Sequence, residues 1–201
     1  MDPHYIFNDT YIYIESLDFD IDFHLDTYSE ELKALTNVIT SPRRKREVIM
    51  AHIMVKKLIS PHATICHTPH GAPFIKDFDG FISISHSSTH IALAINHNHP
   101  IGIDLENWRE QLLKVKSRFL SEKEAASYTS PLQLLQAWTA KEALYKIAQS
   151  PGISLADDIS LPSHATASNL ATVKTPNGTS SFSIHHIEST SEQCLTLACP
   201  I

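Results

Sequence analysis

The stretch FISISHSSTHIALAINHNHPIGIDLEN, residues 81–107, contains three short runs in which apolar and polar side chains alternate, the second only approximately. Such alternation is typical of strands with one buried face. Polar segments at residues 86–90 and 96–100 separate the runs and are expected to be turns. The sequence therefore predicts three strands, at residues 81–85, 91–95 and 101–105, that form a β-meander.

A long helix is expected on each side of this meander. Ser41 and Pro42 give an N-cap and a proline at the first helical position, and an apolar face then continues to residue 60. Residues 131–149 have the strongest helical pattern, and Pro151-Gly152 ends it. With further short strands near both ends of the chain, we expect an α+β fold. We predict two similar subdomains, residues 1–100 and 101–201, related by a pseudo-twofold axis, each a long helix packed on a small antiparallel sheet.

Composition excludes several classes of protein. The 201 residues are 42% hydrophobic, enough for a core, and the formal net charge of -6 argues against a general nucleic-acid binder. No apolar run approaches the ~20 residues that cross a bilayer, and the first residues lack the pattern of a secretory signal. The three cysteines have no CxxC spacing, so we expect a reducing, cytoplasmic location, no membrane association and no zinc ribbon. The 13 histidines could hold zinc, but none has the spacing of a known site.

Two acids lie two positions apart at the end of the third predicted strand. Asp104 and Glu106 should therefore point to the same face. Two like charges this close repel each other unless a cation lies between them, and Mg²⁺ prefers carboxylate oxygens. The alternative is a pair of solvated acids beside a turn.

Two other sets of charged residues can likewise be interpreted either as part of a binding site or as ordinary surface features. Glu142 and Lys146 are four residues apart on the second long helix, where they share a face or form an ordinary surface ion pair. Arg43, Arg44 and Arg46 follow Ser41 at the start of the first helix, where positive charge is unfavourable against the helix dipole. This cluster indicates either a nearby anion, such as a phosphate, or a solvated basic helix start.

Taken together, the motifs resemble those of the 4′-phosphopantetheinyl transferase superfamily, in its long, pseudo-dimeric, surfactin-synthetase-activating type. The segments that carry the resemblance are GAP at residues 71–73, SISHSSTHIALAI at 83–95, IGIDLEN at 101–107, RFLSEKE at 118–124 and WTAKEALYK at 138–146. They come in the family's order across residues 41–146. Each segment is weak alone, and their order makes the resemblance specific.

The resemblance implies a fold and a reaction. The fold is a pair of similar α+β subdomains joined as a pseudo-dimer, with the site at their interface, so we expect a monomer. The reaction transfers 4′-phosphopantetheine from coenzyme A to a serine hydroxyl of an acyl or peptidyl carrier protein and releases 3′,5′-ADP. It requires Mg²⁺ as the cofactor.

The resemblance also implies residue roles. Asp104, Glu106 and Glu142 resemble the magnesium ligands, and Lys146 should contact a phosphate of the diphosphate. The base that takes the serine proton is Glu142, directly or through a metal-bound water, or else Glu124; the sequence does not separate these choices. Further coenzyme A contacts are expected from Ser85 and His86, from the arginine cluster and from the loop Gly71, Ala72 and Pro73.

The sequence departs from the family pattern at two basic positions. Ala72 replaces the lysine of the family's G-K-P loop, and His52 stands where an arginine is usual. Coenzyme A binding should therefore be weaker, or Arg43 and Arg44 should compensate. These losses leave open a non-catalytic member that binds coenzyme A or carrier protein, and a metal phosphodiesterase is a third possibility. Ser85-His86 does not indicate a serine hydrolase, because there is no G-x-S-x-G elbow and adjacent strand residues point to opposite faces.

Overall fold

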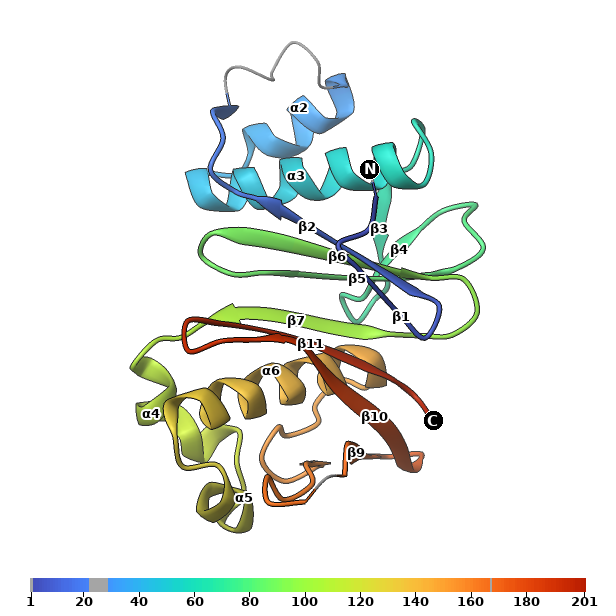
Figure 1. Ribbon diagram of the computed structural model, residues 1–201. Helices are drawn as coiled ribbons and strands as arrows, with labels where there is room; N and C mark the ends of the chain where they lie inside the picture. Colours follow the sequence, from blue (N-terminus) through green and yellow to red (C-terminus); the bar gives the residue numbers. More distant parts are fainter. Residues whose placement is uncertain (1, 22–28, 167) are drawn as a thin grey trace.

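The computed structural model describes residues 2–21, 29–166 and 168–201. Two antiparallel sheets form the middle of the molecule (Figure 1). The first sheet has the order β1-β2-β6-β5 and the second has the order β7-β11-β10-β9-β8. The strands of the first sheet are β1 Tyr5–Phe7, β2 Thr10–Ser16, β5 Phe81–His86 and β6 His90–Asn96. Those of the second are β7 Gly102–Asn107, β8 Ile159–Ser160, β9 Leu170–Thr175, β10 Gly178–Ser189 and β11 Gln193–Pro200.

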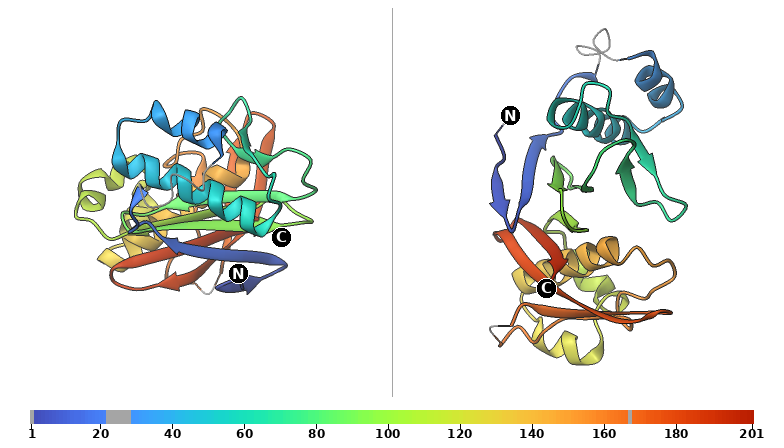
Figure 2. Two further views of the ribbon diagram at one scale, coloured as in Figure 1. Left: turned by 90° about the horizontal axis from the view of Figure 1, so that it is seen from above. Right: turned by 90° about the vertical axis from the view of Figure 1, so that its right-hand side faces the viewer.

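Helices cover the outer face of each sheet, which gives four layers (Figures 1 and 2). The helices are α2 Glu30–Asn37, α3 Pro42–Leu58, α4 Gln111–Val115, the 3₁₀ turn η2 Lys116–Arg118, α5 Glu122–Ser127 and α6 Pro131–Ala148. Helix α3 packs on the first sheet through Met54 and Val55. Helix α6 packs on the second sheet through Ala140 and Leu144. We refer below to the part up to Asn96 as the N-terminal half and to the part from Gly102 as the C-terminal half.

The inner faces of the two sheets form a third apolar core. Ala92 and Ala94 of β6 lie there with Ile103 and Leu105 of β7, and all four are at most 1% exposed. Because successive side chains in a strand point to opposite faces, burying Ile103 and Leu105 in this core turns Asp104 and Glu106 toward helix α6. The sheet stacking therefore determines where the paired acids point.

The predicted β-meander is wrong at its third strand. β5 and β6 pair as expected, but β7 pairs with β11 instead of β6, so the chain passes from one sheet to the other between Asn96 and Gly102. The alternation of residues 101–105 identified a strand correctly, but alternation does not specify the partner of a strand. Asp104 thus lies in the C-terminal half, with its strand buried on both faces.

Most other predicted elements are confirmed. Ser41 caps α3 and Pro42 lies in its first turn, as predicted. The structure also shows a capping box of Ser121 and Glu124 at the start of α5. Residues 65–75 contain a small hairpin, β3 Ile65–His67 with β4 Pro73–Ile75. The α+β class is confirmed, whereas the pseudo-twofold relation and the boundary at residue 100 stay predictions. No helix among the described residues is both long and apolar enough to cross a membrane.

Candidate active site

Helix α6 and strand β7 approach each other unusually closely at Gly102. A Cβ atom placed on Gly102 would lie 2.0 Å from the carbonyl oxygen of Ala143, so only glycine fits there. This approach brings the acids at the end of β7 beside Glu142 and Lys146, one residue before and three residues after Ala143. The predicted strand and helix motifs therefore meet in space.

Asp104 is held by a side chain from each half of the molecule. Its Oδ1 atom accepts a hydrogen bond of 2.7 Å from the Ser85 hydroxyl of β5 and lies 2.8 Å from Lys146 Nζ of α6. Lys146 also donates to the carbonyl oxygen of Ile103, at 2.8 Å. Asp104 is buried, and these contacts fix its carboxylate beside α6.

The two remaining acids differ from each other in their pairing. Glu106 forms an ion pair with Arg109 at 2.8 Å and accepts from the Asn107 amide, while burial raises its pKa. The side-chain carboxylate of Glu142 forms no hydrogen bond or ion pair with another described residue. Burial, followed by the negative charge of Asp104, raises the pKa of Glu142 to about 7. Glu142 can therefore take up or release a proton near neutral pH.

Two of the acids form ion pairs with basic side chains of the protein. Among the described residues, no three histidine, cysteine, aspartate or glutamate side chains are grouped so that they could hold a metal ion. Asp104 instead contacts Lys146, and Glu106 contacts Arg109. The donors are nevertheless hard carboxylate oxygens, and the negative charges of Asp104 and Glu106 add to the effect of burial in raising the pKa of Glu142, so the chemistry of this donor set suits Mg²⁺.

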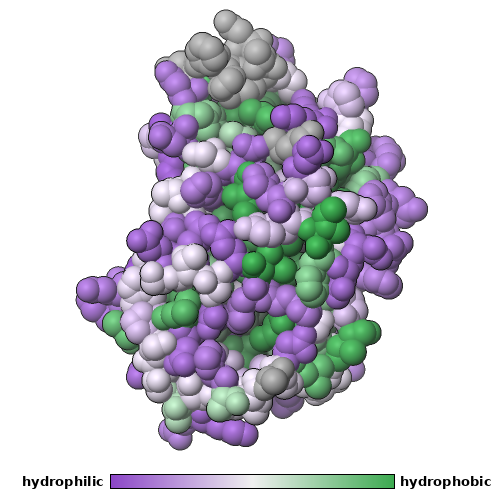
Figure 3. All heavy atoms as spheres, in the orientation of Figure 1, coloured by the Kyte–Doolittle hydropathy of each residue, from purple (hydrophilic) through white to green (hydrophobic). Residues whose placement is uncertain are grey.

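A cleft of about 570 Å³ opens beside Lys146, where the two halves meet. Arg44 and His86 line it from the N-terminal half, together with the apolar side chains of Val48 and Ile84. Near the level where the halves meet, apolar side chains reach the surface among polar ones (Figure 3). The cleft thus combines basic groups with an apolar wall, as suits a ligand with both an anionic and an apolar part.

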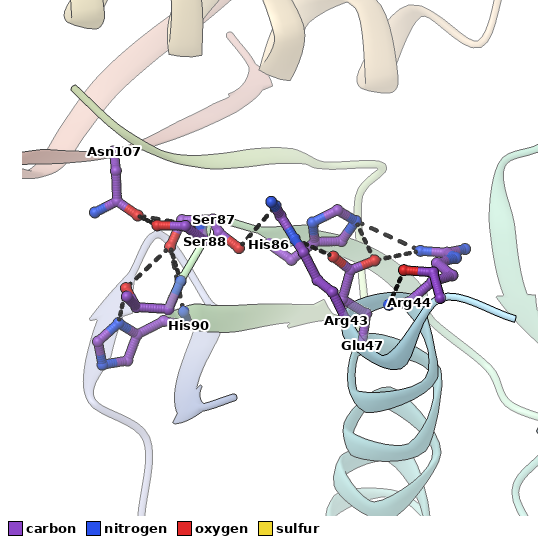
Figure 4. Close-up of polar contacts among 10 residues, drawn as sticks. Arg43, Arg44, Glu47, His86, Ser87, Ser88, His90 and Asn107 are labelled. Carbon is purple, nitrogen blue, oxygen red and sulfur yellow. Dashed lines mark hydrogen bonds and ion pairs between the residues drawn. The ribbon is translucent and has the colours of Figure 1, made fainter. Parts of the chain in front are cut away.

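Glu47 organises the basic side of the cleft. Its carboxylate, 5% exposed, lies 3.0 Å from Arg43 Nε, 3.0 Å from Arg44 and 3.2 Å from His86 Nε2 (Figure 4). Arg43 also donates to the carbonyl oxygen of Ser87. Burial lowers the pKa of His86 although Glu47 acts to raise it, which keeps the imidazole neutral. Nδ1 of His86 is buried without a hydrogen-bonding partner among the described residues.

Glu124, the second candidate base, lies in a different environment. Its Oε2 atom is 2.8 Å from Nζ of the fully buried Lys141 and accepts from Ser121, while its Oε1 atom accepts from the Leu161 amide at 2.7 Å. Lys141 also donates to the carbonyl oxygens of Leu155 and Ile159. No described contact joins Glu124 to Asp104 or Glu142. The contacts of Glu124 are those of a structural residue.

The structure brings most of the other predicted binding residues to the cleft. The predicted residues that line it are Arg44, His52, Gly71, Ala72, Pro73, His86 and Lys146. Three predicted side chains do not line the cleft: Arg43 reaches the carbonyl oxygen of Ser87, Arg46 donates to the carbonyl oxygen of Phe19 at 3.0 Å, and Ser85 is buried against Asp104. The predictions did not include Glu47 and Arg109. Their spacing of three or four residues from Arg43, Arg44 and Glu106 was the available signal, because such pairs meet on a helix or a tight turn.

Residues 100–198, which contain the acids of β7 and helix α6, match the family model described as the 4′-phosphopantetheinyl transferase superfamily. This match covers 99 of the 201 residues, and over that part the chain is similar to the superfamily. A curated relative, the 4′-phosphopantetheinyl transferase gsp of Aneurinibacillus migulanus, is 32% identical over 108 residues. The match covers 50% of this chain and 45% of the relative, so the chain matches less than half of that relative's length. The superfamily match includes Asp104, Glu106, Glu124, Glu142 and Lys146, and lies outside the basic cluster around Glu47.

Proposed function

We propose that this protein transfers the 4′-phosphopantetheine group from coenzyme A to a serine hydroxyl of a carrier protein and releases 3′,5′-ADP. One observation carries the proposal. The acids of β7 and the Glu142–Lys146 pair of α6 occupy a single site, and Lys146 also lines the cleft that holds Arg44 and His86. Acids, a lysine and an adjoining basic cleft are the groups that a metal-assisted attack on a diphosphate needs.

Asp104, Glu106 and Glu142 are the residues that would hold Mg²⁺. Their oxygens suit a hard cation. The pKa of Glu142 is raised first by burial and then by the negative charges of Asp104 and Glu106, and a cation would offset this repulsion. When bound, Mg²⁺ supplies Lewis-acid neutralisation of the phosphate oxygens. Lys146 and Arg109, which now pair with two of these acids, are then available to anionic oxygens of the donor.

In the reaction, the Glu142 carboxylate accepts the proton of the carrier serine. The serine oxygen forms a bond to the phosphorus atom that carries the pantetheine group. The bond from that phosphorus to the bridging oxygen breaks, and its electron pair leaves with 3′,5′-ADP. Lys146 stabilises the negative charge that develops on the phosphate oxygens. Glu124 takes no part, because both of its oxygens already accept structural hydrogen bonds.

The basic side of the cleft binds the phosphates of coenzyme A through Arg44, with Arg43 beside it. Glu47 offsets part of this positive charge, and Ala72 and His52 add no permanent charge to the wall. We therefore expect the arginine pair to compensate for the basic residues that are missing elsewhere in the cleft.

One chain supplies all of these groups, which supports a monomer of the long, pseudo-dimeric type with a division near residue 100. A cytoplasmic location would give access to coenzyme A and to an apo acyl or peptidyl carrier protein.

A mass-spectrometric assay tests the proposal. Apo carrier protein, coenzyme A and Mg²⁺ are incubated with the enzyme, and the carrier should gain one phosphopantetheine group while 3′,5′-ADP accumulates. A chelator and the variant Asp104→Asn should each abolish the mass gain. Coenzyme A binding without transfer would identify a non-catalytic member, and cleavage of coenzyme A without a carrier would identify a phosphodiesterase.

A further inference from the structure

Strands β5 and β7 are joined by serine side chains. Among the described residues no backbone ladder pairs β5 with β7. Instead, Ser83 Oγ accepts a hydrogen bond from the Ile103 amide at 3.0 Å, and Ser85 Oγ accepts one from the Leu105 amide at 3.1 Å. The two serines are 4% and 5% exposed. Because they are two residues apart on one strand, they make equivalent contacts to alternate residues of the other.

The two serines differ in where their hydroxyl protons go. Ser85 donates its proton to Asp104 Oδ1 at 2.7 Å, whereas no described carboxylate contacts Ser83. A hydroxyl has one proton to donate, so Ser85 cannot also donate to a phosphate while it holds Asp104. In this structure the Ser85 proton goes to an acid of the site, and the contact of Ser85 with coenzyme A stays a prediction.

Asp104 is oriented by donors from both sides of the molecule. Oδ1 accepts from Ser85 of β5 and from Lys146 of α6, both within 2.8 Å. No described residue forms a hydrogen bond with Oδ2. Two donors on one carboxylate oxygen fix the rotation of the group and leave the other oxygen available to an incoming ligand.

We propose that Ser85 is a positioning residue that holds the Asp104 carboxylate in the orientation needed to bind a divalent cation. Ser85 comes from the N-terminal half, and the acid comes from the C-terminal half. The cation site is then complete only while β5 of the N-terminal half and β7 of the C-terminal half keep the alignment that brings Ser85 to Asp104. This inference rests on the proposed function, which is where the cation enters, and it assigns a role to a residue outside the set of ligands.

The test compares Ser85→Ala with Ser83→Ala. Each variant removes one buried hydroxyl that accepts a β7 amide, and Ser85→Ala also removes the donor to Asp104, so its loss of thermal stability should be the larger of the two. Binding of Mn²⁺, used as a spectroscopic probe for Mg²⁺, is measured from the electron paramagnetic resonance of the free ion in the absence of coenzyme A. Ser85→Ala should weaken Mn²⁺ binding about 10–100-fold, the usual effect of losing a hydrogen bond to a ligand. Ser83→Ala should change it less than twofold, and Ser85→Thr, which keeps the hydroxyl, should restore most of it.

Transfer activity supplies the second measurement. The Mg²⁺ concentration for half-maximal transfer should rise in Ser85→Ala by about the same factor as the Mn²⁺ dissociation constant, and it should not change in Ser83→Ala. The proposal is overturned if folded Ser85→Ala binds Mn²⁺ like the wild type, if both alanine variants weaken it equally, or if the wild type binds no Mn²⁺ at millimolar concentration. A wild type that binds Mn²⁺ but transfers nothing would reject the proposed function, and the binding comparison would still decide the role of Ser85.

Discussion

Two glutamates that the sequence made candidate bases have opposite surroundings. Glu124 is 7% exposed and each of its oxygens accepts at least one hydrogen bond, including those from Lys141 and the Leu161 amide. Glu142 is half-buried beside Asp104, and no described residue donates a hydrogen bond to it. Lys141 and Glu142 are neighbours on helix α6, yet Lys141 points into the core and Glu142 into the site.

The contrast shows that pairing, rather than burial, separates a structural acid from a reactive one. A buried carboxylate with a cation and several donors is stable as an anion, and Glu124 serves to join α5, α6 and the segment before β9. Glu142 is half-buried without a donor to its carboxylate, so burial and then the charge of Asp104 make it hold its proton more tightly. The following experiments test this difference, starting with the largest expected effect.

Exchanging each glutamate for glutamine should separate the two roles. Glu142→Gln keeps size and polarity but removes the proton acceptor, so transfer should fall about 1000-fold, within the range for a general base. Its stability should not decrease. Glu124→Gln should lower stability and leave transfer per folded molecule nearly unchanged. Rates from the carrier-modification assay and unfolding by denaturant measure the two effects, and a larger loss of rate in Glu124→Gln would reverse our assignment.

The buried lysine gives the next largest effect. Burial lowers the pKa of Lys141, while Glu124 acts to raise it and keep the lysine charged. Lys141→Met leaves Glu124 as an unpaired buried charge, which should reduce the free energy of unfolding by about 3–5 kcal/mol. The double variant Lys141→Met/Glu124→Gln should recover part of this loss, because neither charge remains. If the double variant is as unstable as the sum of the single variants, the pair is not the cause.

Lys146 also pairs with an acid and lies five residues after Lys141 on helix α6, so Lys146→Met is the variant to compare with Lys141→Met. Lys146→Met removes the partner of Asp104, but Lys146 is 29% exposed, so water screens part of the change. We expect a smaller loss of stability than in Lys141→Met and a much larger loss of transfer. Equal effects of the two lysines on both measurements would show that the two ends of α6 do not differ in function.

Local features of the fold were predictable from the sequence, and strand partners were not. Ser41 and Pro42 marked a helix start because caps are local chemistry, and the structure begins helix α3 there. The predicted meander failed because alternation shows that residues 101–105 form a strand without showing which strand lies beside it. Only the structure shows that β7 belongs with β11, more than 80 residues later in the chain.

The residues of the candidate site were predictable from the sequence, but the environment of each one was not. The motifs named Asp104, Glu142 and Lys146, and the structure places them together. The sequence could not separate Glu124 from Glu142, because their environments depend on contacts with Lys141 and with residues far along the chain. Tertiary contacts of this kind decide whether a carboxylate is paired.

The pH dependence of stability tests the environment of Glu142. Burial and Asp104 raise the pKa of Glu142 from 4.5 to about 7, so the folded protein binds this proton more tightly than the unfolded chain. The extra stability is complete below pH 4.5 and is lost as the pH rises toward 7. It amounts to about 3 kcal/mol at most. In magnesium-free buffer, the wild type should lose this much stability relative to Glu142→Gln between these two pH values. Parallel curves for the two proteins would show that Glu142 does not titrate there.

The smallest effect concerns the pair of arginines that share Glu47. Both contact this carboxylate, but Arg44 lines the cleft and Arg43 instead reaches the carbonyl oxygen of Ser87. Arg44→Ala should raise the KM for coenzyme A about tenfold, equivalent to about 1.4 kcal/mol, with little change in kcat. Arg43→Ala removes the same charge at the same distance from Glu47, and its effect should be clearly smaller. Steady-state kinetics decide the point: equal increases in KM would mean that the cleft responds to net charge alone, and no increase in either variant would remove the arginines from donor binding.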